Sequence, residues 1–237
     1  RQLKAQGVRA IAVCTLFSFL NPMHERRIRE IILQEYPECY VSISSDILPQ
    51  VREYERTSTT AVNAYVGPVL GRYLRNLHDK LTGAGLKREV LITQSNGGIM
   101  AAGSAREKSV ATVLSGPAGG VIGSQFLANL AGVRDLITLD IGGTSTDICL
   151  IADGKYLTTK ESEIGGHAVK LPMIDINTIG AGGGSIAWID QGGALRVGPE
   201  SAGADPGPAC YGKGGREATV TDANLVLGRL NARYYVG

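Results

Sequence analysis

One segment constrains the fold of this chain more than any other: residues 140–147, which read DIGGTSTD and lie between two apolar segments. The apolar runs 136–139 and 147–152 predict two β-strands. Glycine-rich sequence between two strands predicts a β-hairpin, whereas many nucleotide-binding loops lead from a strand into a helix. We therefore expect an antiparallel pair of strands whose turn spans residues 140–146.

The residue types in this hairpin suit phosphate. Two glycines lack side chains, so their backbone amides can approach phosphate oxygens closely, and three consecutive hydroxyls can donate hydrogen bonds to the same oxygens. An aspartate at each end supplies the carboxylate that holds hydrated Mg²⁺. The alternative is a plain turn, although three hydroxyls flanked by two acids exceed what a turn requires. The candidate phosphate-binding residues are Gly142, Gly143, Thr144, Ser145 and Thr146, and the candidate catalytic carboxylates are Asp140 and Asp147.

Two common nucleotide-binding motifs do not fit this segment. A Walker A loop requires Gly-Lys-Ser/Thr followed by a helix, and neither is present after residue 147. The Rossmann fingerprint also requires a helix directly after its strand. The hairpin therefore belongs to a different class of phosphate loop.

Two further glycine-rich segments are candidate ligand sites. Residues 115–120 (SGPAGG) open a helix predicted over 118–130, whose free amides and dipole favour an anion. Tight helix packing also requires small residues and is an equal alternative. Residues 180–185 (GAGGGS) can wrap a nucleotide or form a flexible turn. The candidate nucleotide-binding residues in these segments are Gly116, Gly119, Gly120, Gly182, Gly183 and Gly184.

The composition is that of a globular protein. Of 237 residues, 43% are hydrophobic and 19% charged, which suffices for one large domain or two small ones. The net charge of +2 and the scattered basic residues argue against nucleic-acid binding, and charged runs such as 24–27 and 52–56 predict solvated helix faces. The apolar stretch 11–20 is too short to span a bilayer. Four cysteines in apolar or small-residue surroundings predict free thiols and a cytoplasmic location.

Hydrophobic periodicity outlines the other elements. Residues 8–16 predict a buried strand, a helix follows with Pro22 at its first position, and 40–44 predict a second strand, which together make a βαβ-like unit. Residues 54–81 predict a long helix that Pro68 kinks or interrupts. A further buried strand is predicted over 89–93, and a closing helix over 219–230, capped by Thr221 or Asp222.

The hairpin resembles the phosphate loops of the actin-like ATPase fold, which unites sugar kinases, actin and the large heat-shock chaperones. Further segments, in the same order along nearly the whole chain, resemble the hydantoinase A/5-oxoprolinase family, with N-methylhydantoinase A and acetone carboxylase among its relatives. These segments are YERTSTT (54–60), SNGG (95–98), SGPAGG (115–120), DIGGTSTD (140–147), PMIDINT (172–178), the glycine run 180–185 and GPESAGADPGPACYG (198–212).

The resemblance implies a fold and a division of the chain. The fold is α/β, of the actin-like (ribonuclease H-like) type, with mixed sheets flanked by helices. Residues 1–95 would end the first actin-like half with a long linking helix. Residues 96–237 would form the second half, which carries the phosphate hairpin and the glycine-rich nucleotide loops, with the glycine run near the adenosine end of ATP.

The resemblance also implies an activity, namely ATP-dependent opening of a cyclic amide such as a hydantoin or 5-oxoproline, in which ATP phosphorylates the amide or carbonyl oxygen. Related members carboxylate ketones. The expected cofactors are ATP and Mg²⁺ or another divalent cation, and the expected partners are a small cyclic amide or ketone and a B-type subunit or domain, with no nucleic acid and no membrane. Two other classes stay open: a non-catalytic actin-like ATPase switch, such as a reactivase or chaperone, and a sugar or pantothenate kinase.

Three residues are candidate metal ligands: Asp140, Asp175 and His167. A histidine with carboxylates is a common set for a divalent cation, while a surface histidine and a helix-capping aspartate are the alternatives for the last two.

Three other residues have competing interpretations. Glu55 and Arg56 either form ion pairs or orient a substrate. Cys210 lacks a histidine near it in sequence, which favours a buried structural role over a nucleophile.

The chain opens without Met on what reads as the end of a helix. We therefore expect a piece of a longer protein that lacks an upstream phosphate loop, binds ATP weakly and hydrolyses none.

Overall fold

The computed structural model describes residues 1–234, whose contacts divide the chain into two compact units. Unit 1 contains Arg1–Ile122 and Leu157–Asp175, and unit 2 contains Gly123–Tyr156 and the chain from Ile176 onward. The chain therefore leaves unit 1 and later returns to it. These units differ from the predicted parts 1–95 and 96–237, whose assignment to two actin-like halves stays a prediction.

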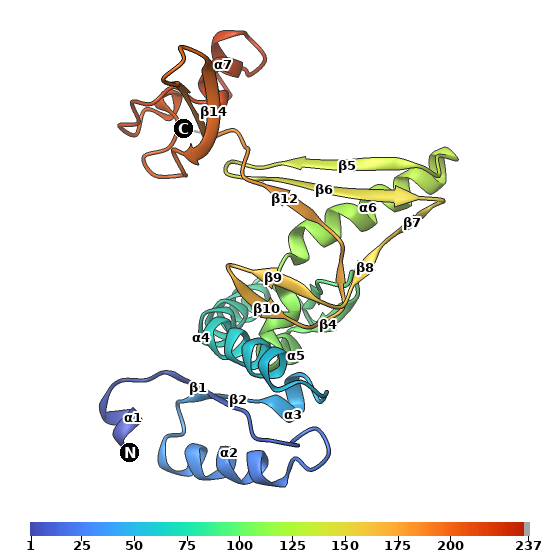
Figure 1. The fold of residues 1–237 in the computed structure, drawn as a ribbon, viewed down its shortest axis with the longest axis vertical. Helices are drawn as coiled ribbons and strands as arrows, with labels where there is room; N and C mark the ends of the chain where they lie inside the picture. Colours follow the sequence, from blue (N-terminus) through green and yellow to red (C-terminus); the bar gives the residue numbers. More distant parts are fainter. Residues whose placement is uncertain (235–237) are drawn as a thin grey trace. The chain divides into compact units, whose positions relative to one another are not determined.

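Unit 1 begins with the predicted βαβ unit (Figure 1). After α1 (Gln2–Ala5), β1 (Ala10–Val13) and β2 (Tyr40–Ile43) pair in parallel, and α2 (Met23–Glu35) connects them. Pro22 is the N-cap of α2 and not its first helical residue, which places the start of the helix one residue later than predicted. The short α3 (Ser44–Ile47) follows β2 directly.

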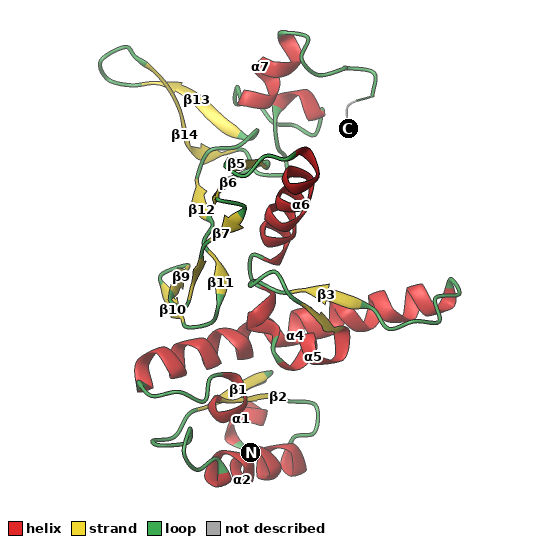
Figure 2. Cartoon of the chain, turned by 90° about the vertical axis from the view of Figure 1, so that its right-hand side faces the viewer, coloured by secondary structure: helices red, strands yellow, loops and turns green. Residues whose placement is uncertain are grey.

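The long helix α4 (Glu53–Gly83) extends along unit 1 and packs against β1 and β2 (Figure 2). Pro68 lies inside this helix and does not interrupt it. Gly67, just before the proline, allows the ring of Tyr40 to pack directly on the helix, because a Cβ at Gly67 would lie 2.2 Å from that ring. The Tyr40 hydroxyl donates to the carbonyl oxygens of Arg106 and Glu107, at 2.9 and 3.0 Å.

The elements that follow α4 begin with a short hairpin and two short helices, and α5 and η1 pack on α4. The hairpin β3 (Leu91–Thr93) and β4 (Ile99–Ala101) leads into α5 (Ala102–Glu107) and the 3₁₀ helix η1 (Ser109–Thr112), and α6 (Ser115–Ala131) begins in unit 1. The strand predicted over 89–93 is shorter, and it is not buried, since Leu91 is exposed.

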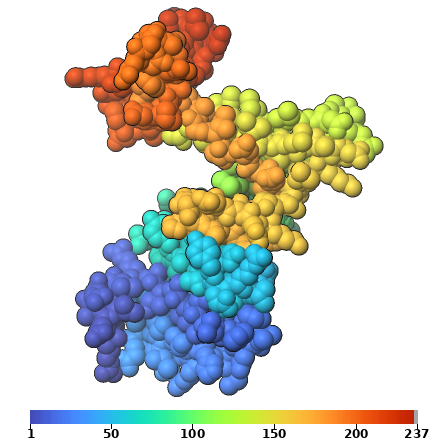
Figure 3. Space-filling view, viewed as in Figure 1, coloured from blue at the N-terminus to red at the C-terminus, as the bar shows by residue number. Residues whose placement is uncertain are grey.

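The segment that returns to unit 1 forms two antiparallel pairs. β8 (Thr158–Thr159) pairs with β11 (Met173–Ile174), and β9 (Ser162–Ile164) pairs with β10 (His167–Val169). Figure 3 shows this segment, in yellow-orange, lying against α4, in cyan. Its apolar side chains complete a core cluster of Ile47, Val110, Val169 and Met173, all buried.

Unit 2 contains the predicted hairpin, formed by β5 (Leu136–Ile141) and β6 (Thr146–Ala152). β7 (Lys155–Tyr156) and β12 (Asn177–Ile179) both pair with β6, also antiparallel. The turn is shorter than predicted: it contains only residues 142–145, because Asp140, Ile141 and Thr146 belong to the strands.

The remainder of unit 2 consists of the hairpin β13 (Ser185–Ile189) and β14 (Leu195–Ser201), the 3₁₀ helix η2 (Ala209–Tyr211) and α7 (Val220–Val226). The predicted closing helix, 219–230, is shorter, and its N-cap is Thr219. Thr219 and Asp222 form a capping box, in which each side chain accepts a hydrogen bond from the other's backbone N–H. Asp222 thus contributes to the cap as predicted, whereas Thr221 does not.

Across residues 1–234, no helix is both long enough and apolar enough to cross a membrane.

Candidate functional site

The candidate site is the turn of the β5–β6 hairpin. Asp140 lies directly opposite Asp147 in the strand register, and Ile141 lies opposite Thr146. The N–H of Gly142 donates to the carbonyl oxygen of Ser145 at 2.8 Å and closes the turn. The Gly142 amide, which the sequence suggested for phosphate, is therefore engaged within the turn.

The glycine run holds this turn from one side. The N–H of Gly183 donates to the carbonyl oxygen of Gly142 at 2.9 Å, and the N–H of Gly184 donates to that of Gly143 at 2.6 Å. The approach requires glycine, since a Cβ at Gly182 would lie 2.7 Å from the Gly142 oxygen and 2.8 Å from the Thr144 nitrogen. These glycines were predicted to contact a nucleotide directly, but two of their amides bind the hairpin.

The contact with the glycine run fixes the direction of two other amides. In a planar trans peptide, the N–H points away from the C=O. Because the carbonyls of Gly142 and Gly143 face the glycine run, the N–H groups of Gly143 and Thr144 point to the opposite side. Within residues 1–234, neither amide donates a hydrogen bond to the protein, and both residues are exposed. Successive free amides of this kind form an anion-binding nest.

The two aspartates lie opposite each other at the ends of the strands that flank the turn, and they are the candidate ligands for a cation. Side chains directly opposite each other in an antiparallel pair lie on one face of the sheet, and like charges in that arrangement destabilise the pair. A divalent cation removes the repulsion, and Mg²⁺ in phosphate sites is bound through one or two carboxylates together with water and phosphate oxygens. Asp140 and Asp147 therefore fit Mg²⁺. The Asp147 carboxylate also accepts the hydroxyl of Thr178, at 2.5 Å, which fixes its orientation.

The three predicted hydroxyl donors have different environments. Thr144 is exposed and Ser145 is half-buried, so both are at the surface of the turn. Thr146 is buried, and its hydroxyl donates to the carbonyl oxygen of Ala181 at 2.5 Å. Thr146 therefore ties the hairpin to the glycine run, and the candidate phosphate donors are reduced to Thr144 and Ser145.

The other predicted ligands belong to unit 1. Gly116, Gly119 and Gly120 lie in the first turns of α6; a Cβ at Gly116 or Gly120 would meet nothing within 4 Å, so helix packing does not require glycine at these two positions. His167 and Asp175 are exposed. Among residues 1–234, no three His, Cys, Asp or Glu side chains are grouped so that they could hold a metal ion. Asp140 belongs to unit 2, whereas Asp175 and His167 belong to unit 1, so their grouping as metal ligands stays a prediction.

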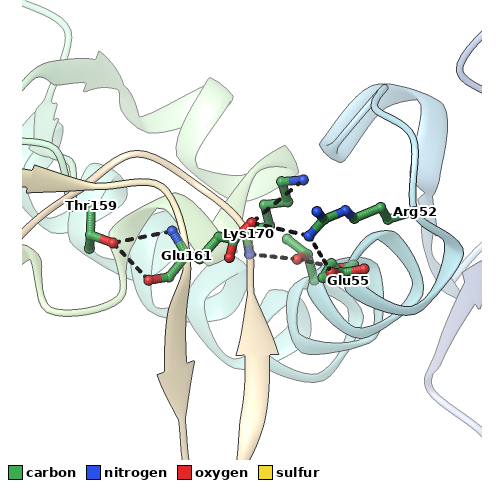
Figure 4. A network of polar contacts seen from close by, with 6 residues as sticks. Arg52, Glu55, Thr159, Glu161 and Lys170 are labelled. Atoms are coloured by element: carbon green, nitrogen blue, oxygen red, sulfur yellow. Dashed lines mark hydrogen bonds and ion pairs between the residues drawn. The ribbon is translucent and has the colours of Figure 1, made fainter.

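Two residues of the charged run 52–56, Arg52 and Glu55, belong to a network of ion pairs (Figure 4). Glu55 pairs with Arg52 at 3.3 Å, and Arg52 and Lys170 both approach Glu161, at 3.5 and 3.9 Å. This network attaches the β9–β10 hairpin to the start of α4. The backbone N–H of Lys170 adds a hydrogen bond to the Thr59 hydroxyl, at 3.0 Å.

Arg56, in contrast, is buried and anchors loops. Its guanidinium donates to the carbonyl oxygens of Gln50 and Thr15, at 2.8 and 2.9 Å, and lies 5.3 Å from the centre of the Phe19 ring. The solvated face predicted for this run is wrong at Arg56, which is 0% exposed. These contacts favour a structural role for Arg56 over a role with substrate.

Glu25 is a second exception to the predicted solvated faces, since it is also 0% exposed. Its carboxylate accepts hydrogen bonds from the Thr15 N–H, the Ser44 hydroxyl and the Ser45 N–H, at 2.8, 2.7 and 2.8 Å. Desolvation by burial raises the pKa of Glu25, but these hydrogen bonds outweigh it and lower the pKa below its ordinary value. Glu25 and Arg56 thus bind opposite ends of the Thr15 residue and fix the loop after β1.

Sequence reasoning did not assign to Thr221, Ser185 and Thr178 the role of supporting the hairpin and the glycine run. The first two are buried, and each binds the glycine run: the Ser185 hydroxyl accepts the Gly182 N–H at 2.9 Å, and the Thr221 hydroxyl donates to the Gly183 carbonyl at 2.8 Å. Sequence gives no signal for the contacts of Thr221 with Gly183 and of Thr178 with Asp147, because these residues are 38 and 31 positions apart.

Cys210 is half-buried, and its backbone N–H donates to the Asp222 carboxylate at 2.7 Å. Desolvation and the nearby Asp222 carboxylate raise the pKa of the Cys210 thiol. A raised pKa disfavours the thiolate that a nucleophile requires, so the structural interpretation is supported.

Comparison with known proteins identifies relatives along the whole chain. Residues 56–237 match the Hydantoinase/oxoprolinase family model, and residues 1–36 match its N-terminal-region model. The chain is 44% identical to the caprolactamase subunit alpha of Pseudomonas jessenii, over 96% of this chain and 33% of that one. It is 45% identical to 5-oxoprolinase 1 of Arabidopsis thaliana, over 97% and 18% respectively.

A solved structure supports the fold. The nucleotide-free structure of acetone carboxylase, an enzyme of ATP-dependent acetone carboxylation, is similar to this chain. The match has a TM-score of 0.83 and 32% identity, and it covers 98% of this chain and 33% of that one. The predicted α/β, actin-like class is confirmed by this match. The chain thus spans a third or less of the length of these relatives.

Proposed function

Because this chain belongs to the hydantoinase/oxoprolinase family, we propose that it carries a phosphate-binding part of an enzyme that opens a cyclic amide at the expense of ATP. The observation that carries the proposal is the turn 142–145, where the amides of Gly143 and Thr144 point away from the glycine run and donate to no acceptor within the described residues 1–234. Free amides beside two opposed carboxylates are the combination that a phosphate with its Mg²⁺ requires.

The reaction uses ATP to activate a stable amide. The γ-phosphoryl group is transferred to the amide oxygen and ADP leaves. One water adds to the activated carbon, and the C–N bond breaks with a proton transferred to nitrogen, which gives an acyl phosphate. A second water hydrolyses the acyl phosphate to the carboxylate and inorganic phosphate. Mg²⁺ neutralises charge on the phosphates when it is bound. The residues of this chain orient the phosphates: the Gly143 and Thr144 amides and the Thr144 and Ser145 hydroxyls donate hydrogen bonds, and Asp140 and Asp147 hold the cation.

Two other features of the function remain proposals. The caprolactamase relative is named as a subunit, which supports a partner subunit or domain of the B type for this protein. A cytoplasmic location, predicted from the cysteines, stays a prediction.

A ketone carboxylase is the second candidate, because the acetone carboxylase structure matches this chain with a TM-score of 0.83. Both candidates use the same phosphate site, and they differ in the molecule that accepts the phosphoryl group. The substrate therefore distinguishes them.

The test measures ATP hydrolysis by the full-length protein, with any subunit that copurifies, in the presence of cyclic amides or of ketones with bicarbonate. We expect one compound to stimulate hydrolysis, and Asp140→Asn or Asp147→Asn to reduce it by about tenfold or more, since a hydrogen bond or contact with a charged group contributes ~1.5–3 kcal/mol. Asp153→Asn is the matched control, because Asp153 is an exposed carboxylate on the same unit whose only described partner is Arg134.

Stimulation by a cyclic amide supports the amidohydrolase, and bicarbonate-dependent stimulation by a ketone supports the carboxylase. The proposal is contradicted, and an ATPase switch is favoured, if no compound changes the rate of ATP hydrolysis or if both hairpin substitutions leave that rate unchanged.

A further inference from the structure

The glycine run is itself held by α7, and the contact is made by one residue. The carbonyl oxygen of Gly183 accepts two hydrogen bonds from Thr221, one from its N–H and one from its hydroxyl, both at 2.8 Å. Thr221 is buried, and a Cβ at Gly183 would lie 2.7 Å from its hydroxyl oxygen. The two residues therefore fit each other closely.

These contacts continue the contacts of the turn. Gly183 uses its N–H to bind the Gly142 carbonyl and its C=O to bind Thr221. The turn, Gly183 and Thr221 are thus joined in series by hydrogen bonds. Gly184 is held in the same way, because its carbonyl accepts the N–H of Ala202 at 2.8 Å.

The far end of this series is also fixed. The Asp222 carboxylate, next to Thr221, accepts the N–H and the hydroxyl of Thr219, at 2.9 and 2.8 Å, and the N–H of Cys210 at 2.7 Å. The first turn of α7 is therefore attached both to its own cap and to η2. A displacement of Thr221 requires that these contacts break as well.

We propose that Thr221 is a positioning residue for the phosphate-binding turn. It holds Gly183, Gly183 holds the Gly142 carbonyl, and the direction of that carbonyl sets the direction of the Gly143 amide. Thr221 touches neither phosphate nor substrate in this arrangement. The inference rests on the proposed function, since it assigns to Thr221 the orientation of the donors that the proposed function uses.

The structure distinguishes the hydroxyl from the rest of the side chain. Thr221→Val keeps the shape and removes the hydroxyl, so the Gly183 carbonyl loses one of its two donors. Thr221→Ser keeps the hydroxyl and removes only a methyl group. The matched control is Ile151→Val, because Ile151 is buried in the same unit, lies at the opposite end of β6 from the turn, and pairs with Leu136 and Tyr156.

The experiment compares the three variants with wild type in the full-length protein. The measurements are the dissociation constant of MgATP by calorimetry, the thermal midpoint, and the hydrogen exchange of peptides that cover 140–147 and 180–186. We expect Thr221→Val to weaken MgATP binding by about fivefold, the equivalent of one ordinary hydrogen bond, and to accelerate exchange in both peptides. We expect Thr221→Ser to bind MgATP with an affinity within twofold of wild type. We expect Ile151→Val to lower the thermal midpoint without weakening MgATP binding.

Three outcomes overturn the inference. In the first, Thr221→Val exchanges like wild type in both peptides, a result that is decisive even if the protein binds no nucleotide. In the second, exchange accelerates but MgATP affinity is unchanged. In the third, Ile151→Val weakens MgATP binding as much as Thr221→Val does, which would mean that the loss of affinity reflects lower overall stability and not the Thr221 contact. If Asp147→Asn abolishes MgATP binding while Thr221→Val leaves it intact, the positioning role fails and the proposed function stands. If wild type binds no MgATP, the proposed function fails.

Discussion

Replacing Gly182 with alanine tests the contact between the glycine run and the phosphate-binding turn directly. The added Cβ would lie 2.7 Å from the Gly142 oxygen, 2.8 Å from the Gly143 carbonyl carbon and 2.8 Å from the Thr144 nitrogen. All three are backbone atoms of the turn, so no side-chain rotation relieves the contact. Gly182 does not have a positive φ, so alanine adds no backbone strain and the steric contact is the whole effect.

The structure supports an estimate of the size of this effect. Overpacking of one methyl group in a rigid environment costs about 1–3 kcal/mol, and the three backbone contacts place Gly182→Ala toward the upper end. If the turn moves away to relieve the contact, the hydrogen bonds from Gly183 and Gly184 lengthen, and the Gly143 and Thr144 amides lose their direction. We therefore expect weaker MgATP binding together with lower stability.

Gly180→Ala is the matched control. Gly180 lies two residues away in the same run, has no positive φ, and a Cβ there would meet nothing within 4 Å. The assay is thermal unfolding followed by MgATP titration on the full-length protein. A loss of about 2–3 kcal/mol is expected to lower the thermal midpoint, whereas Gly180→Ala is expected to melt and bind MgATP like wild type.

The reasoning is refuted if Gly182→Ala and Gly180→Ala have the same midpoint and the same MgATP affinity. That result would mean that the run does not press on the turn. A lower midpoint with unchanged affinity would keep the packing argument and remove its link to the nucleotide.

Two further predictions concern stability. Gly67→Ala in α4 is expected to lower the unfolding free energy by about 1–3 kcal/mol, because its Cβ would overlap the anchored Tyr40 ring, whereas Gly71→Ala, with only the Arg75 side chain at 3.8 Å, is expected to raise it by about 0.5–1 kcal/mol; equal effects in urea unfolding would contradict the packing described. Desolvation raises the pKa of Asp222, but hydrogen bonds from Cys210 and Thr219 outweigh it and lower the pKa to about 2. The ionised carboxylate therefore stabilises the fold at any pH above its ordinary pKa near 3.8. This contribution, about 1–2 kcal/mol after allowance for solvent screening, is lost as the pH falls from 4 to 2. Unfolding of Asp222→Asn is expected to lack that component between pH 4 and 2, and an unchanged pH profile would show that Asp222 does not supply it.

Local sequence patterns predicted the type and approximate position of those elements whose signals lie within the element itself. The βαβ unit at the start, the long helix α4 and the β5–β6 hairpin follow from periodicity and turn residues. The family and the α/β class followed from motifs in one order along the chain.

The contacts of the site depended instead on residues far apart in sequence. The hairpin turn is held by the glycine run, and the glycine run by Thr221, across separations that no local pattern encodes. The same limit explains the errors at Arg56 and Glu25. Each reads as one charge in a solvated run, but each is buried and hydrogen-bonded by distant segments: the loop after β1 supplies Thr15 to both, α3 supplies Ser44 and Ser45 to Glu25, and the loop after α3 supplies Gln50 to Arg56. Pro68 was expected to kink or interrupt α4, and the interruption is wrong, because one helix continues from Glu53 to Gly83 through Pro68.

The discontinuity of unit 1 has a consequence for biosynthesis. β11 joins unit 1 through the hydrogen bond from the Ile174 N–H to the Ser95 carbonyl, at 2.9 Å, and β10 joins it through Lys170 and Thr59. On the ribosome, the first 122 residues therefore emerge without the strands that complete their core. At 5–20 residues per second, synthesis from Ile122 to Asp175 takes about 3–10 s, during which Ile47 and Val110 lack Val169 and Met173 as neighbours. A nascent chain in that interval exposes apolar surface to chaperones, and translation pauses between these two points would prolong the exposure.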